Sequence, residues 1–342
     1  MSDASIVKVA VVQAAPVLLD IDGAVEKAIA LMDEAGRKGA QLIAFPETWI
    51  AGYPWWIWLG IPADTIHFSG EYFANSIEAE SVHDQALRDA AKRNHLHAIV
   101  GVSERDGGSL YMGQWHYGPE GEVVARRRKL KPTHAERMVF GEGDGSDLVV
   151  SDTSLGRIGA LCCWEHMQPL VKYAMYSQHE QIHVAAWPAY SLYTDVTYAL
   201  SAELSLAVNQ VYAAEGQCFV LVACSVVSEA IRDRLCDTEE KRKLMKVGGG
   251  YSRIFGPDGS SQAEPLSPNE EGLLVADIDL GHISFAKSAA DPVGHYARPD
   301  VLQLVFNEKA QSVVVQPSED NPPIAQDVEL SSLNNGVDSS KA

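Results

Sequence analysis

The chain has 342 residues, of which 46% are hydrophobic and 21% are charged. This composition is close to that of ordinary globular domains, so it excludes collagenous, fibrous and largely disordered chains. The formal net charge of −19 gives a surface that repels phosphate backbones and anionic lipid headgroups. We therefore expect neither nucleic acid nor a membrane as a partner.

Cysteine usage and the first residues of the chain bear on the compartment. The five cysteines are an odd number and lack both the C-x-x-C spacing and the density of secreted disulfide scaffolds, which favours reduced thiols. Residues 1–19 lack the basic start of a signal or transit peptide. No apolar run approaches the roughly 18–20 residues that a membrane-spanning helix needs. We expect a cytoplasmic protein.

The start of the chain predicts a strand, a helix and a strand, over residues 6–14, 23–38 and 41–45. The strands are predicted from runs of β-branched and apolar residues that are too short for a periodic helix. In the helix, apolar residues recur with a period of 3.6 on one face: Val25, Ala28, Ile29, Met32 and Ala35. Either Asp20 or Asp22 is available as its cap.

The alternation continues with a helix over residues 79–95 and a strand over residues 97–103. A hairpin is then predicted over residues 109–130, because the Gly-Pro-Glu-Gly sequence at 118–121 is a turn signal between two apolar stretches.

The second half repeats this order of elements without repeating the residues. Strands are predicted at 157–163, 182–187, 218–227 and 272–280, helices at 168–178 and 197–215, and a hairpin turn at 256–259. Alternating strands and helices favour α/β layers, and the two hairpins favour antiparallel sheet edges. We expect mixed sheets flanked by helices, with an internal two-fold repeat of elements.

Composition separates a domain from a tail. Residues 316–342 contain no aromatic residue, three prolines and five acidic residues against one lysine. We expect a single domain over residues 1–312 and a tail over residues 313–342 that is disordered or lies along a partner subunit.

Three residues near the ends of predicted strands are candidates for chemistry. Cys163 ends the strand over 157–163, where functional side chains are presented in α/β proteins. A thiolate nucleophile needs a nearby positive charge and a general base, for which Lys129 and Glu47 are available. Taken singly, each residue has a more common explanation. Cys163 would be a buried thiol, Lys129 part of a solvated basic run, and Glu47 an ordinary acid in a loop.

The motifs around these three residues resemble the nitrilase branch of the carbon–nitrogen hydrolase superfamily. They are Phe-Pro-Glu at 45–47, Arg-Lys-Leu-Lys-Pro-Thr at 128–133 and Cys-Cys-Trp-Glu at 162–165, within a resemblance that covers roughly residues 5–305. Cys-Trp-Glu at 163–165 and segment 140–145 are more similar to nitrilases than to amidases or carbamoylases, and segment 294–300 resembles a nitrilase C-terminal motif. The resemblance implies a four-layer αββα sandwich, which agrees with the repeated element order.

The resemblance also implies a catalytic set. Glu47 would be the general base, Lys129 the cation that stabilises the charged intermediate, and Cys163 the nucleophile. Glu136, carried over from the motif, would position Lys129 and the reacting atoms. The implied reaction is hydrolysis of a nitrile to its carboxylic acid and ammonia through a thioimidate and a thioester. No cofactor is implied, and we expect no metal site, because each histidine is more commonly a surface or hydrogen-bonded core residue.

An aromatic pocket is expected beside this set. Tyr53, Trp164 and Trp187 each lie within six residues of a strand end that should face the site, although aromatic clusters are more often core or subunit interface. Such a pocket would favour aryl or arylalkyl nitriles. By resemblance, the aromatic stretch 54–73 and the polar insertion 228–247 would lie at an oligomer surface, in a homo-oligomer of dimers that assemble into spirals.

Other functions remain open at this stage. Within the superfamily these are an amidase, a carbamoylase, or an enzyme that releases mainly the amide from a nitrile. A non-catalytic scaffold has no need of a charged cluster beside a thiol. A nucleotide-binding α/β protein is disfavoured because residues 141–145 do not match a phosphate-loop pattern.

Overall fold

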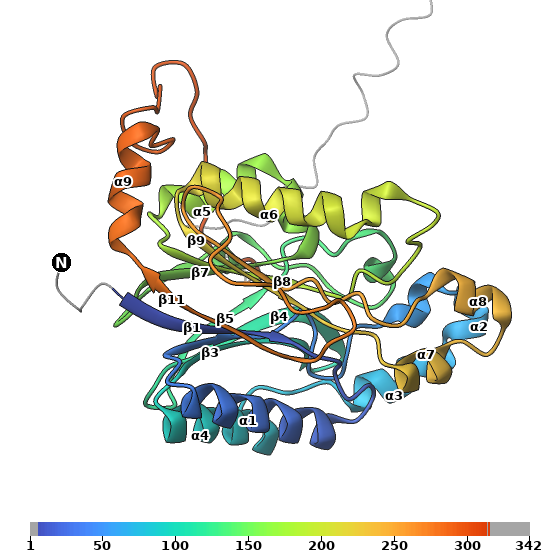
Figure 1. The fold of residues 1–342 in the computed structure, drawn as a ribbon. Coiled ribbons are helices and arrows are strands. Elements are labelled where there is room, and N and C mark those ends of the chain that lie inside the picture. Colours follow the sequence, from blue (N-terminus) through green and yellow to red (C-terminus); the bar gives the residue numbers. More distant parts are fainter. Residues whose placement is uncertain (1–5, 313, 315–342) are drawn as a thin grey trace, which may run out of the picture. The chain divides into compact units, whose positions relative to one another are not determined.

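The computed structural model describes residues 6–312 and residue 314. It separates a unit over residues 1–309 from a second unit over residues 310–342. The fold and the site below concern the first unit, shown in Figure 1. The tail predicted over residues 313–342 lies outside the described residues except for residue 314.

In the described part of the chain, the first sheet has six strands in the order β11-β1-β2-β3-β4-β5. They are β1 (Ile6–Gln13), β2 (Leu42–Ala44), β3 (His97–Asp106), β4 (Ser109–Tyr117), β5 (Val123–Arg128) and β11 (Gly272–Asp279). Strands β1, β2 and β3 are parallel. The predicted hairpin is present as β4 and β5, which form one antiparallel edge, and β11 pairs antiparallel with β1 at the other.

The second sheet has the order β10-β9-β8-β7-β6. Its strands are β6 (Val150–Thr153), β7 (Gly156–Cys162), β8 (Ile182–Trp187), β9 (Phe219–Cys224) and β10 (Arg253–Phe255). Strands β7, β8 and β9 are parallel, and β6 and β10 add antiparallel edges. The units β1-α1-β2-α4-β3 and β7-α5-β8-α6-β9 repeat the same order, which confirms the predicted internal repeat.

The two sheets stack face to face, and helices cover their outer faces (Figure 1). The covering helices are α1 (Ile21–Arg37) and α4 (Val82–Asn94) on the first sheet, and α5 (Pro169–Ser177) and α6 (Ala202–Gly216) on the second. The remaining helices are α2 (Pro62–Thr65), α3 (His67–Ala74), α7 (Glu229–Leu235), α8 (Glu239–Leu244) and α9 (Gly281–Ala289). Within the described residues, no helix combines the length and the apolar character of a membrane span.

Side-chain alternation along β1 explains the four layers. Val7, Val9 and Val11 pack between the sheets against residues of β7, β8 and β9. Ala10 and Val12 point to the other face and pack against α1 and α4. Because successive strand residues face opposite sides, a strand that is buried on both faces reads as a continuous apolar run. The αββα sandwich predicted from the sequence is confirmed.

Some element boundaries differ from the prediction because of local caps. Helix α1 begins at Ile21, two residues before the predicted start, because the Asp20 side chain accepts a hydrogen bond from the Gly23 N–H at 3.0 Å. Helix α6 begins at Ala202 instead of residue 197, because Ser201 caps it through the Leu204 N–H. An N-cap side chain satisfies a donor that the first turn leaves free.

The second predicted hairpin does not form as expected. The turn at 256–259 is present, but the chain after it forms no second strand of a hairpin. It pairs with β10 only through an isolated bridge between Phe255 and Ser261. The following strand, β11, leaves this sheet and pairs along its whole length with β1. An exposed edge of β1 would expose unpaired backbone groups, which β11 satisfies.

Candidate active site

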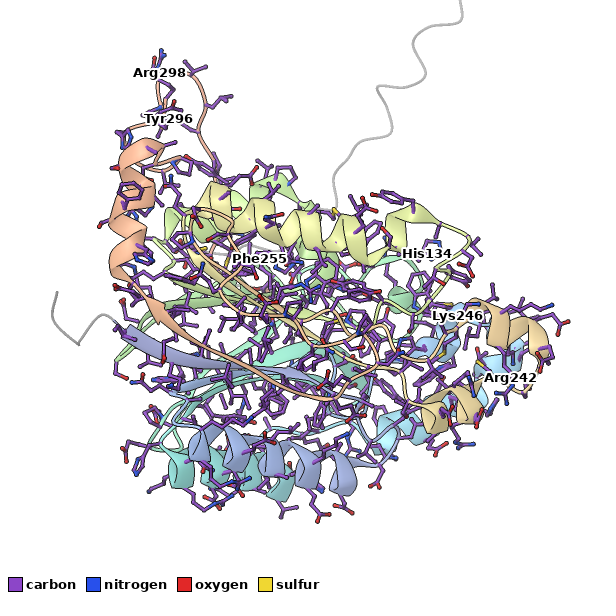
Figure 2. The ribbon with its side chains drawn as sticks, viewed as in Figure 1. His134, Arg242, Lys246, Phe255, Tyr296 and Arg298 are labelled. Carbon is purple, nitrogen blue, oxygen red and sulfur yellow. The ribbon has the colours of Figure 1, made fainter. Side chains whose placement is uncertain are left out.

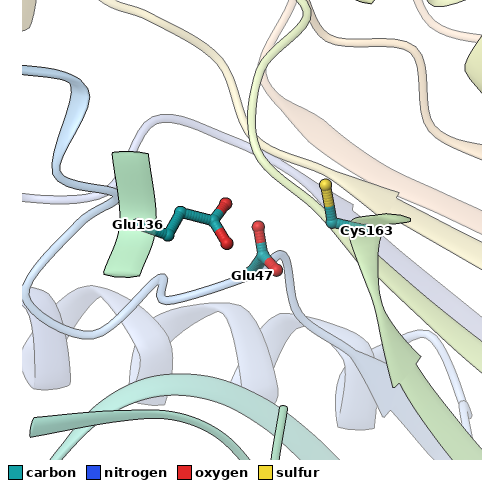
Figure 3. Close-up of side chains that lie close together, drawn as sticks. All are labelled: Glu47, Glu136 and Cys163. Carbon is teal, nitrogen blue, oxygen red and sulfur yellow. The ribbon is translucent and has the colours of Figure 1, made fainter. Parts of the chain in front are cut away.

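Four predicted site residues from both halves of the chain lie together. Glu47 follows β2, Lys129 follows β5, Glu136 lies on the short 3-10 helix η3 (His134–Met138), and Cys163 begins the 3-10 helix η5 (Cys163–Met167) directly after β7. Figure 3 shows the Glu47 carboxylate between Glu136 and Cys163. One oxygen of each carboxylate and the Cys163 Sγ lie within 4.8 Å of one another.

Lys129 is the electrostatic centre of this cluster. Its Nζ lies 3.0 Å from Glu47 Oε1 and 2.7 Å from Glu136 Oε2, and its side chain is 1% exposed. Burial acts to lower the pKa of Lys129, but the two carboxylates outweigh it and hold that pKa well above its ordinary value. A buried charge requires partners of this kind. The cluster therefore keeps a fixed positive charge beside the thiol.

Glu136 is held by several donors in addition to Lys129. The Tyr53 hydroxyl donates to Glu136 Oε1 at 2.7 Å, and the Thr133 N–H donates to Oε2 at 2.6 Å. The Trp58 indole N–H in turn donates to the Tyr53 oxygen at 3.0 Å. These contacts hold the Glu136 carboxylate against the Lys129 ammonium.

Glu47 differs from Glu136 in having one unsatisfied oxygen. Its Oε2 is buried and has no hydrogen-bond partner among the described residues. Burial raises the pKa of Glu47 to about 8, an effect that Lys129 opposes. A carboxylate with a free oxygen and a pKa near neutrality is suited to accept a proton.

Cys163 lies in a strained turn. Its φ of +47° is in the left-handed region, which costs an L-residue roughly 1–2 kcal/mol. Burial, and next the charge of Glu47, raise the pKa of the Cys163 thiol well above its ordinary value. The resting thiol is therefore protonated and needs a base to become a nucleophile. The sequence predicted Cys163 as the last strand residue, but β7 ends one residue earlier.

A buried ion pair joins the strand that precedes Lys129 to the turn that carries Cys163. Arg127 Nη2 lies 2.7 Å from Glu165 Oε1. The same oxygen accepts the Leu130 N–H, and Glu165 Oε2 accepts the Cys162 N–H, each at 2.7 Å. Sequence reasoning missed this pair because it treated residues 126–129 as one solvated basic run. In β5 only the Arg127 side chain is fully buried.

The two carboxylates and the thiol are close enough together to suggest a small metal site. The Lys129 ammonium, however, already lies against both carboxylates, so an added divalent ion would meet a fixed positive charge. His179 and His183 have the H-x-x-x-H spacing, but His179 is exposed on a turn and His183 is buried in β8. These arrangements favour a lysine site over a metal site.

An apolar pocket opens onto Cys163 and Glu136. Tyr53, Trp164 and Trp187, the three predicted pocket residues, all line it. Trp55 and Trp58, which belong to the aromatic stretch expected at an oligomer surface, line the pocket as well. The rest of the lining was not predicted to be part of a pocket: Thr133, Pro188, Ala189, Tyr190, Leu192, Leu200 and Ser205. Leu200 ends the short 3-10 helix η6 (Tyr198–Leu200) and Ser205 lies on α6, and no local pattern connects them to the strand ends.

Comparison with known proteins agrees with this geometry. The carbon–nitrogen hydrolase family model matches residues 8–288. The chain belongs to this family. This hydrolase is 54% identical over 323 residues to a nitrilase of Pseudomonas syringae pv. syringae (strain B728a), a match that covers 94% of the chain and 96% of the relative. Its place is on the nitrilase branch.

Further relatives of this hydrolase carry different names. It is 52% identical to an aliphatic nitrilase of Rhodococcus rhodochrous, over 88% of the chain and 83% of the relative. It is 50% identical to an arylacetone-specific nitrilase of Alcaligenes faecalis, over 90% of the chain and 86% of the relative. The fold matches a carbon–nitrogen hydrolase of Helicobacter pylori G27 with a TM-score of 0.69 at 18% identity, over 87% of this chain and 97% of that one. The chain is thus an enzyme that hydrolyses carbon–nitrogen bonds.

Proposed function

We propose that this nitrilase hydrolyses aryl or arylalkyl nitriles to the carboxylic acid and ammonia, with Cys163 as the nucleophile. The observation that carries the proposal is the buried Lys129 ammonium between Glu47 and Glu136, beside a thiol that opens into an aromatic pocket. Glu47 is proposed as the general base and Glu136 as the residue that holds Lys129.

The first half of the reaction forms a covalent adduct. Glu47 takes the thiol proton as Cys163 Sγ bonds to the nitrile carbon. Negative charge then develops on the nitrile nitrogen, where the Lys129 ammonium stabilises it. Glu47 passes the proton that it took from the thiol to this nitrogen and is again free to act as a base. The product of this half is a neutral thioimidate.

The second half consumes two water molecules. Glu47 deprotonates the first water as it adds to the thioimidate carbon. The resulting tetrahedral intermediate loses its nitrogen as ammonia and leaves a thioester on Cys163. The second water, deprotonated in the same way, breaks the carbon–sulfur bond. The carboxylic acid leaves and Sγ regains its proton, so the cycle needs no redox partner.

Shape and polarity of the pocket support an aromatic substrate. Four tryptophans and two tyrosines contribute rings to the walls: Tyr53, Trp55, Trp58, Trp164, Trp187 and Tyr190. Most of the other lining residues are apolar, and Pro188, Ala189, Leu192 and Leu200 contribute aliphatic surface. Flat aromatic walls bury a ring well and offer few partners to a polar amide chain. The relatives are named for both aliphatic and arylacetone substrates, so their names do not decide the substrate class. The preference for aromatic nitriles is proposed from the residues that line the pocket.

The test is ammonia release from benzonitrile, phenylacetonitrile and an aliphatic dinitrile, with the matching amides run in parallel. We expect release from the aromatic nitriles and its loss in Cys163→Ala. Cys236→Ala is the matched control, since Cys236 is a buried thiol outside the cluster. Turnover of amides or carbamoyl compounds without turnover of nitriles would contradict the proposal. Accumulation of amide from nitriles would show that the main product is the amide and not the carboxylic acid.

We further propose a homo-oligomer in the cytoplasm. Two exposed apolar surfaces support the oligomer. One carries Ile61 and Ile66 in the region of α2, which are 63% and 67% exposed. The other is a groove between α5 and the segment after α9, where Leu170 and Tyr296 are 69% and 67% exposed. Figure 2 shows Tyr296 in that segment, between α9 and Arg298. Such patches need covering. Sedimentation velocity that gave only monomers at micromolar concentration would contradict this.

A further inference from the structure

A row of buried polar side chains runs from the nucleophile into the layer between the second sheet and its helices. His166 Nδ1 lies 2.7 Å from the Cys163 carbonyl oxygen, and His166 Nε2 lies 2.9 Å from His183 Nε2. His183 Nδ1 lies 2.7 Å from Glu180 Oε1. The Tyr212 hydroxyl donates to Glu180 Oε2 at 2.7 Å. The steps proposed above use none of these four side chains.

The direction of each hydrogen bond in the row follows from its first member. A carbonyl oxygen only accepts, so His166 Nδ1 carries the hydrogen, and in a neutral imidazole its Nε2 must then accept. His183 Nε2 therefore donates to His166. If His183 is neutral, its Nδ1 accepts, and Glu180 must donate as a protonated carboxyl group.

Burial supports this neutral arrangement. The side chains of Glu180 and His183 are at most 1% exposed. Burial raises the pKa of Glu180 to about 8. Burial also lowers the pKa values of His166 and His183 well below their ordinary value. The row thus consists of uncharged donors and acceptors that all point toward the Cys163 carbonyl.

The surrounding residues leave room for this row. A Cβ atom at Gly159 of β7 would lie 2.0 Å from Glu180 Oε1, so the carboxyl group occupies space that only glycine leaves. The His183 ring stacks on Tyr212 with centroids 4.0 Å apart, and the His166 ring stacks on Trp187 with centroids 5.5 Å apart. The rings are therefore fixed in both position and orientation.

We propose that His166, His183, Glu180 and Tyr212 form a positioning network that holds the Cys163 carbonyl, and so keeps the nucleophile in its left-handed conformation. The inference rests on the proposed function of Cys163 as nucleophile. The four residues touch no reacting atom, so they are positioning residues. The φ angle of Cys163 is +47°. A residue with a side chain rarely adopts this conformation unless its surroundings hold it there, and the network supplies that support.

Two substitutions of Glu180 separate positioning from mere packing. Glu180→Leu leaves His183 Nδ1 without a hydrogen-bond donor, so the His183 ring can change its tautomer. The hydrogen bond from His166 Nδ1 to the Cys163 carbonyl oxygen is then no longer enforced. We expect kcat to fall about 10- to 100-fold, as for a lost buried hydrogen bond, and KM to stay within about threefold. Glu180→Gln supplies an N–H donor and a carbonyl acceptor in the same place, so its kcat should stay within about threefold of the parent.

A second measurement does not depend on nitrile turnover. The rate at which iodoacetamide alkylates Cys163, followed by peptide mass spectrometry, should fall about tenfold in Glu180→Leu and little in Glu180→Gln. If the parent enzyme fails to hydrolyse nitriles but shows this alkylation pattern, the proposed function fails and the network stands.

Tyr176→Phe is the matched control. Its hydroxyl lies 3.5 Å from the Tyr212 carbonyl oxygen in the same layer but outside the network, so kcat and the alkylation rate should not change. If Glu180→Leu does not fold, Tyr212→Phe keeps the stacked ring and removes only one donor, and a loss of kcat at unchanged KM would support the network. Parent-like kcat in folded Glu180→Leu, or equal losses in Glu180→Leu and Glu180→Gln, would overturn it.

Discussion

The Arg127 guanidinium and the Glu165 carboxylate form an ion pair at 2.7 Å whose side chains are 3% and 0% exposed. Burial acts to raise the pKa of Glu165, but Arg127 and the backbone donors outweigh it and hold that pKa below its ordinary value. The pair connects β5, which ends just before Lys129, to η5, which begins at Cys163. It therefore sets the relative position of two catalytic candidates that come from different sheets.

Removing one member of this pair should destabilise the protein strongly. Glu165→Leu leaves Arg127 buried without a counter-charge, which costs about 3–5 kcal/mol. The double variant Arg127→Met/Glu165→Leu removes both charges and should recover most of that loss. Urea denaturation of the three proteins measures the free energies of unfolding. A double variant as unstable as Glu165→Leu would show that packing, and not the unpaired charge, causes the loss.

The activity should rise with pH as the proposed base ionises. The pKa of Glu47 is raised to about 8, so below that pH most of the free enzyme carries a protonated carboxyl group that cannot take the thiol proton. A plot of kcat/KM between pH 6 and 10 should show a rising limb near pH 8, which belongs to Glu47 and Cys163 together. A profile that is flat across this range would contradict the assignment of Glu47 as the base.

The same shift has an opposite effect on stability. Because the pKa of Glu47 is higher in the folded protein than its ordinary value of 4.5, folding favours the protonated form. The contribution of Glu47 to stability is full below pH 4.5 and is lost as the pH rises through about 8. The Glu47→Gln variant should be inactive and should show a weaker dependence on pH, because buried Glu180, whose pKa is also raised to about 8, still contributes the same trend. Urea unfolding at several pH values compares the two proteins.

Lys129 should be needed for charge stabilisation more than for substrate binding. Lys129→Met removes the only cation within hydrogen-bond distance of Glu47 and Glu136 among the described residues. We expect kcat to fall by about 10²–10³-fold, as for loss of one electrostatic stabiliser in other active sites. Steady-state kinetics on the best nitrile measures this. Lys131→Met is the control, because Lys131 pairs with Glu142 at the surface. A similar loss of kcat in Lys129→Met and Lys131→Met would contradict a specific role of Lys129, because removal of any nearby positive charge would then have the same effect.

Tyr53 should act through Glu136. Tyr53→Phe keeps the ring in the pocket wall but removes the hydroxyl that donates to Glu136 Oε1. Loss of a hydrogen bond to a charged group costs about 1.5–3 kcal/mol, so kcat should fall about 10- to 100-fold. Tyr72→Phe serves as control, since its hydroxyl donates to the Gly52 carbonyl outside the pocket. An increase in KM alone would instead assign Tyr53 to substrate binding.

Local sequence patterns were sufficient for the long elements. Helix α1 has one apolar face that packs on the sheet, and β1 is apolar on both faces because helices cover one side and the second sheet the other. The strand ends that carry Glu47 and Cys163 followed from the same patterns. The elements α2, α7 and β6 were not predicted, because each is too short for a period to emerge and none forms a continuous apolar run such as the one that indicated β2.

Long-range contacts explain what the sequence could not show. The Arg127 side chain is buried while those of its neighbours in β5 are not. Its counter-charge Glu165, together with acceptors on Gln114 and Asp147, makes that possible. His166, His183 and Glu180 look like ordinary polar residues in the sequence, but the turn after β7 and the neighbouring strand β8 bring them together behind Cys163. Such networks depend on three-dimensional neighbours and leave no periodic signal.

The pairing of β11 with β1 in the first sheet also has a consequence during synthesis of the chain. The strand that completes the sheet beside β1 is among the last to leave the ribosome, since it spans Gly272–Asp279. Until then, β1 presents an open edge that invites pairing with other nascent chains. Truncation before residue 272 should therefore yield an aggregating chain rather than a smaller active enzyme, although all four proposed catalytic residues would already have been made.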